Sequence, residues 1–135
     1  MDASRSLQSV PHDGLDFRIS SGVLAGDAYV VSVGGEVDLF TAPRLDERLV
    51  DLADAGARRV VVDLAGASFI DSTVLGVLLK ALARFEHEGG ALAIVTDDRR
   101  ILRVFEITGL NRVFRLMPSL TDAVEAMVAV PGEHV

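Results

Sequence analysis

Residues 59–64, with the sequence Arg-Val-Val-Val-Asp-Leu, form a run that is apolar at four of its six positions. A valine-rich run of this kind is typical of a strand in a parallel sheet whose two faces are both covered. The segment 73–87 follows, and its apolar residues recur at helical spacing. Gly89 and Gly90 interrupt that pattern, and the apolar run 91–95 comes next. A strand, a helix and a second strand in this order predict a right-handed crossover between parallel strands.

The rest of the chain continues this alternation of strand and helix patterns. Alternating apolar residues indicate strands, and apolar residues three or four positions apart indicate helices. These patterns predict strands at 15–20, 28–33 and 112–116 and helices at 43–55, 98–108 and 119–128. The predicted fold class is α/β, with a mixed, mostly parallel sheet of about four to five strands and about four helices. We expect the first strand to lie antiparallel at an edge of this sheet.

The two ends of the chain differ in character from the segment between them. Residues 1–14 mix Ser, Asp, His and Pro without periodicity, and residues 130–135 are similar. We therefore expect a flexible N-terminal tail at 1–14, one folded domain at 15–129 and a C-terminal tail at 130–135. A chain of 135 residues can bury a core that needs neither a disulfide nor a metal.

Composition and charge exclude several classes of partner and location. The chain has 20 acidic and 13 basic residues and a formal net charge of −7, which argues against binding to nucleic acid or to an anionic membrane. It has no cysteine, so disulfides and thiolate metal sites are excluded. The N-terminal sequence does not resemble a secretory signal, and no apolar run approaches the ~18 residues of a membrane span. We therefore expect a cytoplasmic protein.

Sequence patterns that accompany catalysis are largely missing. There is no Gly-x-Ser-x-Gly nucleophile motif and no phosphate-binding loop ending in Gly-Lys. His12, His87 and His134 lie far apart, and no spacing of His, Asp and Glu resembles a metal site. We predict no catalytic residue, no cofactor and no metal. Asp63, at the end of the run 59–64, is a weaker candidate for a phosphate-accepting aspartate, because the other acidic and lysine residues of such sites are missing.

Three small polar residues, Asp71-Ser72-Thr73, precede the most apolar helix pattern of the chain. The simplest interpretation is helix capping, in which a side-chain oxygen accepts a bond from a free backbone N–H. A hydroxyl at a helix N-terminus also lies where free N–H groups and the helix dipole favour an added anion, so it could carry a phosphate. Spacing alone leaves both interpretations open and makes capping the more common one.

Several motifs together resemble the STAS domain family and, within it, the bacterial anti-sigma factor antagonists. They are Gly35–Leu45 (GEVDLFTAPRL), 61–64 (VVDL) and 69–76 (FIDSTVLG). Residues 104–114 and 119–123 are similar to the last helix-to-strand segment and the last helix of the family. The resemblance covers nearly the whole predicted domain. It implies the STAS fold and a binding protein that is not an enzyme.

The resemblance also implies a partner-switching mechanism in the regulation of transcription, often in stress responses. The serine after the motif aspartate, here Ser72, is phosphorylated by a partner that is both an anti-sigma factor and an ATP-dependent serine kinase. The unphosphorylated antagonist binds this kinase and thereby releases the sigma factor. Phosphorylation at Ser72 abolishes binding, and a metal-dependent serine phosphatase restores it.

The residues around Ser72 receive roles from the same resemblance. Asp71 either orients the Ser72 hydroxyl, contacts the partner or caps the helix, and we favour orientation together with contact. Thr73 is a candidate partner contact and a less suitable phosphate acceptor than Ser72. Val74 departs from the family, because many antagonists have glycine at this position. A β-branched residue there adds bulk beside the acceptor.

The loop before the helix at 43–55 adds two further candidates. Asp38 and Thr41 are candidate partner contacts, because this loop lies near the phosphorylated serine in the family. Thr41 is equally suited to be the N-cap of that helix. An alternative function remains open: a STAS subunit of another assembly, such as a lipid-transport ATP-binding-cassette complex. The complete Asp-Ser-Thr motif favours the antagonist.

Overall fold

The computed structural model describes residues 16–25 and 28–128. Its helices and strands follow the predicted alternation. In chain order they are β1 (Arg18–Ala25), β2 (Ala28–Val37), α2 (Ala42–Asp54), β3 (Arg59–Ile70), α3 (Ser72–His87), β4 (Ala91–Val95), α4 (Arg99–Ile107), the 3-10 helix η1 (Leu110–Arg112), β5 (Arg115–Met117) and α5 (Leu120–Val128). The predicted tails, the domain boundaries at 15 and 129, and both His12 and His134 lie outside the described residues.

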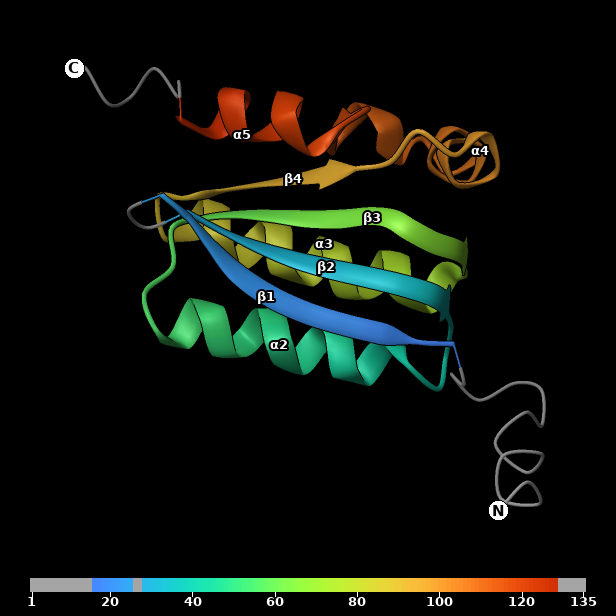
Figure 1. Cartoon of the computed structure of the whole chain (residues 1–135), viewed down its shortest axis with the longest axis horizontal. Helices are drawn as coiled ribbons and strands as arrows, with labels where there is room; N and C mark the ends of the chain where they lie inside the picture. Colours follow the sequence, from blue (N-terminus) through green and yellow to red (C-terminus); the bar gives the residue numbers. More distant parts are fainter. Residues whose placement is uncertain (1–15, 26–27, 129–135) are drawn as a thin grey trace, which may run out of the picture.

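The five strands form one sheet in the order β1-β2-β3-β4-β5 (Figure 1). β1 runs antiparallel to β2 at one edge, and the other pairs are parallel, so the predicted α/β class and the antiparallel edge strand are confirmed. β3 is the central strand, where Val61 pairs with Val30 on one side and with Ala93 on the other. Its three valines are completely buried, as expected for a strand covered on both faces.

Helices cover the two faces of the sheet unequally. The larger core joins β2, β3 and β4 to the apolar sides of α2, α3 and α4. The smaller core joins Val61, Ala93 and Val95 of the sheet to Ala123 and Met127 of α5. Figure 1 accordingly shows α2 and α3 side by side on one side of the strands and α5 on the opposite side. No described helix is long and apolar enough to span a bilayer.

The ends of four strands differ from the predicted ranges, and the second strand continues past Val33 to Val37. The first strand begins at Arg18 rather than 15 and continues to Ala25, because pairing with β2 extends it through residues that show no apolar alternation. The last strand is shifted to Arg115–Met117, since η1 occupies the start of its predicted range. β3 continues past Leu64 to Ile70 by pairing with β2 alone.

The extension of β3 depends on glycines in β2. The pairing of β2 with β3 shifts register after Ser32 and again after Gly35. Gly35 has φ +84°, and a Cβ there would collide with the carbonyl oxygen of Asp16, so only glycine fits. With these two register shifts, β2 and β3 stay paired up to Val37 and Ile70, so both strands stop at the same end of the sheet. The loop after β2 and the start of α3 are therefore neighbours.

Candidate functional site

The Asp71-Ser72-Thr73 motif lies at the junction of β3 and α3. β3 ends at Ile70 and α3 begins at Ser72, so the single residue Asp71 joins them. The predicted helix began at Thr73, and the structure moves its first residue to Ser72. The Ser72 side chain is exposed and forms no hydrogen bond within the part of the chain that the structure describes. Its hydroxyl is thus available to an approaching enzyme.

Asp71 is the N-cap of α3. Its extended backbone, with φ −118° and ψ −177°, brings Oδ1 within 2.9 Å of the Thr73 nitrogen and 3.3 Å of the Val74 nitrogen. The other oxygen, Oδ2, accepts a hydrogen bond from the Leu39 N–H at 3.1 Å. Asp71 thereby satisfies two free N–H groups of the helix and ties the loop between β2 and α2 to it.

This arrangement changes the role predicted for Asp71. We favoured an aspartate that orients the Ser72 hydroxyl, but both carboxylate oxygens accept bonds from backbone N–H groups, and no bond to Ser72 is present among the described residues. The capping alternative is the one that the structure shows. Sequence reasoning missed the second bond, since it joins Asp71 to a residue 32 positions earlier in the chain.

Asp38 and Thr41 brace the loop between β2 and α2. The Asp38 carboxylate Oδ1 accepts bonds from the N–H groups of Phe40 at 2.9 Å and Thr41 at 3.2 Å. The Thr41 hydroxyl accepts a bond from the Asp38 N–H at 2.9 Å and donates to the Glu36 carbonyl oxygen at 3.3 Å. These bonds fix the loop in one conformation beside Asp71.

Thr41 does not fit either predicted role completely. Only 5% of its surface is exposed, so little of its side chain is available to a partner in this conformation, and the predicted partner contact stays a prediction. It occupies the N-cap position of α2, but its side chain makes no capping bond to that helix. The reason is that its hydroxyl is already engaged with Asp38 and Glu36. Asp38 is half-buried and remains a candidate contact.

Three exposed apolar side chains flank this junction, and the sequence analysis did not identify them. Leu39 and Phe40 in the loop are 60% and 70% exposed, and Phe69 near the end of β3 is 49% exposed. Leu39 is held next to Asp71 by its N–H, and Phe69 pairs with Glu36 just before the loop. Apolar groups exposed together at one end of a sheet mark a surface suited to protein binding. The signal in the sequence was the pair Leu39-Phe40 within a polar loop.

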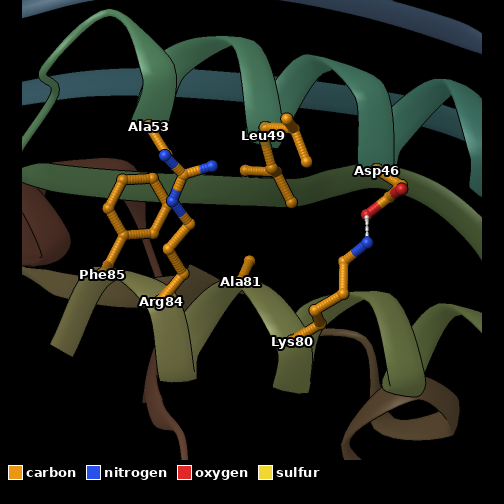
Figure 2. Close-up of a pocket in the computed structure, with 8 residues that line it drawn as sticks. Asp46, Leu49, Ala53, Lys80, Ala81, Arg84 and Phe85 are labelled. Atoms are coloured by element: carbon orange, nitrogen blue, oxygen red, sulfur yellow. Dashed lines mark ion pairs between the residues drawn. The ribbon is translucent and has the colours of Figure 1, made fainter. Parts of the chain in front are cut away.

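A hollow of about 380 Å³ opens beside Thr73, between the first turns of α2 and α3. Its lining residues are Leu39, Ala42, Pro43, Asp46, Thr73, Gly76, Val77 and Lys80. Asp46 and Lys80 form an ion pair at 2.8 Å that joins the two helices. Figure 2 shows this pair, with Leu49, Ala81 and Phe85 lining a second hollow of about 220 Å³ further along the helices.

Arg84 lies at the far end of the second hollow. Its guanidinium bonds Asp54 of α2 at 2.8 Å and Glu88 at 3.1 Å. These carboxylates, Asp54 above all, raise the pKa of Arg84. The two charged links, at Lys80 and Arg84, hold α2 and α3 together across an otherwise apolar seam. Both links are partly exposed to solvent, so each contributes little to the free energy of unfolding.

The described residues contain no cluster of potential metal ligands. They contain no group of three or more His, Asp or Glu side chains close enough to hold an ion. Asp63, the alternative phosphate acceptor, is not at the end of its strand, because β3 continues to Ile70. Its Oδ1 accepts a bond from the Ala65 N–H at 2.9 Å. The interpretation of Asp63 as a phosphate acceptor assumed that it lies at the end of its strand, and that assumption was wrong.

The two roles of Asp71 can be separated by mutation. Asp71→Ala removes the helix cap and the bond to Leu39, and we expect it to lower the free energy of unfolding by about 1–2 kcal/mol. Asp71→Asn keeps an oxygen for the cap but places an amide NH₂ opposite the Leu39 N–H, so we expect about half that loss. Urea unfolding measures both, and hydrogen exchange should show faster exchange of the Leu39 amide in each variant. Equal losses of stability in the two variants would contradict the idea that the helix cap and the bond to Leu39 contribute separately.

Comparison with known proteins identifies the family. The model of the STAS domain family matches residues 17–123. An anti-sigma-B factor antagonist of Staphylococcus epidermidis is 43% identical over 85 residues, which cover 63% of this chain and 79% of that protein. The crystal structure of an anti-sigma factor antagonist from Mycobacterium paratuberculosis has 31% identity and a TM-score of 0.73, and the match covers 82% of this chain and 95% of that one.

A second crystal structure, of a Thermotoga maritima protein, agrees with the fold alone. It has a TM-score of 0.74 at 22% identity and covers 87% of this chain and 99% of that one. The region matched by the family model, residues 17–123, includes all five strands, the helices α2, α3 and α4, and the start of α5. The resemblance seen in the sequence is confirmed, and this chain belongs to the STAS domain family.

Proposed function

We propose that this chain is an anti-sigma factor antagonist controlled by phosphorylation of Ser72. In its unphosphorylated form it binds an anti-sigma factor that is also an ATP-dependent serine kinase, and the sigma factor is released. The observation that carries the proposal is the exposed Ser72 hydroxyl at the first position of α3, flanked by exposed Leu39, Phe40 and Phe69. The names of the relatives support it.

The position of Ser72 suits a switch that changes binding and spares the fold. A phosphate adds about −1.5 to −2 charges. At the N-terminus of α3 this charge meets the positive end of the helix dipole, although the neighbouring Asp71 reduces the gain. In a protein interface the same charge must lose its water beside apolar side chains, which is unfavourable. Phosphorylation should therefore weaken binding much more than it weakens folding.

The structure favours Ser72 over Thr73 as the acceptor. Ser72 is exposed, whereas Thr73 is half-buried against the hollow between α2 and α3. A kinase must bring the acceptor oxygen into its own active site, so exposure is the first requirement. Asp71 and Thr73 flank Ser72 in the chain, and Asp38 lies in the loop that the Leu39–Asp71 bond ties to α3. We assign these three residues to the surface that binds the partner.

Phosphate mapping tests the proposal directly. Purified serine kinases of the source organism that bind a sigma factor are incubated with ATP and the chain, and the product is mapped by mass spectrometry. We expect one phosphate, on Ser72, and none in Ser72→Ala. Thr73→Ala and the control Ser68→Ala, an exposed serine of β3, should still be phosphorylated. Phosphate on Thr73 alone, or its persistence in Ser72→Ala, would contradict the proposal.

The remaining partners follow from this role. A metal-dependent serine phosphatase would remove the phosphate and return the chain to its binding form. The chain itself is then a substrate and a binding protein rather than an enzyme, and it works in the cytoplasm with the transcription machinery. Copurification with a transport ATPase in place of a serine kinase would instead favour the alternative of a transport-complex subunit.

A further inference from the structure

Gly76 occupies an unexpected position in α3. It is the fifth residue of the helix, one turn after Ser72 on the same side, and it is exposed. Glycine inside a helix is unfavourable compared with alanine, because it loses more backbone entropy on folding. A glycine at this position therefore lowers the stability of the helix unless packing or binding compensates.

The folded chain supplies no packing reason. The positive-φ glycines of the described chain are Gly35, Gly56, Gly89 and Gly109, so Gly76 has an ordinary helical backbone that alanine also adopts. A Cβ at position 76 would meet no heavy atom within 4 Å. This is unlike Gly90, where a Cβ would collide with the carbonyl oxygen of Arg58. Internal packing therefore tolerates a side chain at position 76.

Gly76 does, however, line the hollow of about 380 Å³ beside the phosphorylation motif. Thr73 lies on the Ser72 side of this hollow, and Leu39, Pro43 and Val77 supply apolar surface. The Asp46–Lys80 ion pair lies further along, with both charges already matched. A side chain at position 76 would stand in the opening, so its absence keeps a largely apolar hollow accessible one helical turn from Ser72.

We propose that Gly76 is a clearance position, at which an apolar side chain of the partner kinase enters the hollow and rests on the backbone of α3. The inference rests on the proposed function and deepens it. A kinase that takes the Ser72 oxygen into its active site covers the surface around it, and the hollow begins at the next residue. A neutral, apolar group fits, since Asp46 and Lys80 neutralise each other and the remaining lining is mainly apolar.

The test combines stability with binding. The probe is the purified kinase that phosphorylates Ser72, titrated in the presence of ADP so that no phosphate is transferred. Gly76→Ala should raise the melting temperature by about 2–5 °C, because alanine favours the helix. Gly76→Leu should weaken kinase binding about tenfold or more, with Gly76→Ala between it and the unmodified chain. The control Ala83→Leu adds bulk at an exposed position of α3 outside the hollow and should bind normally.

The outcomes separate this inference from the proposed function. If the kinase phosphorylates Ser72 and binds Gly76→Leu as tightly as the unmodified chain, the clearance role is refuted and the proposed function stands. A melting temperature lowered by Gly76→Ala would also refute it, because the glycine would then serve the fold. If no sigma-factor-binding kinase of the organism phosphorylates Ser72, the proposed function fails and this inference fails with it.

Discussion

The variant Ser72→Glu is expected to bind the cognate kinase about tenfold or more weakly than the unmodified chain, whereas Ser72→Ala should bind as tightly. Alanine removes only a hydroxyl that forms no hydrogen bond within the described chain. Glutamate introduces a charge next to Asp71, on a surface that also exposes Leu39 and Phe40. In the complex this charge would lose its hydration without gaining a partner, which is costly. Titration of the purified proteins measures the difference.

The same variants should leave the fold intact. An exposed negative group in the first turn of a helix is favourable by about 0.3–1 kcal/mol, so Ser72→Glu should melt close to the unmodified chain. A matched control is Thr121→Glu, which places the same charge at an exposed position in the first turn of α5, on the opposite face of the sheet. It should not change kinase binding. Equal affinity for Ser72→Glu and Ser72→Ala, or an equal loss with Thr121→Glu, would refute the switch.

The largest effect on stability is expected from Phe105→Ala, at about 3–5 kcal/mol of unfolding free energy. Phe105 is 0% exposed and packs edge-to-face on Phe114, with ring centroids 5.7 Å apart and an interplanar angle of 82°. It is one of two buried residues of α4, the other being Ile101. Its loss leaves a cavity where α4 and η1 meet the larger core, to which α4 otherwise contributes only the smaller side chains of Ile101 and Val104.

Ile107→Ala is the matched control for this prediction. Ile107 lies in the same helix but is 72% exposed, so its truncation should change stability by no more than about 0.5 kcal/mol. Urea unfolding monitored by circular dichroism compares the two variants. Losses of similar size would show that α4 is not anchored through Phe105. Kinase binding by the folded fraction of Phe105→Ala should be normal, since the binding surface proposed around Ser72 includes no residue of α4.

Local patterns in the sequence were enough to predict most of the fold. The buried run 59–64, the amphipathic segment 73–87 and the antiparallel edge strand all appear in the structure close to their predicted places. Each rests on residues a few positions apart, because helical and strand periodicity and helix caps involve only near neighbours. The candidate phosphate acceptor Ser72 was found in the same way, from its position before an apolar helix and from the family motif.

The arrangement around Ser72 depends instead on contacts between distant parts of the chain. The bond from the Leu39 N–H to Asp71 spans 32 positions, and it exists because β2 and β3 end side by side. Thr41 is buried by its tertiary contacts, whereas its neighbours Leu39 and Phe40 are exposed. The open hollow at Gly76 likewise requires α2 and α3 to pack together. Periodicity shows which side of an element is buried, but the path of the chain determines which residues meet and which remain exposed.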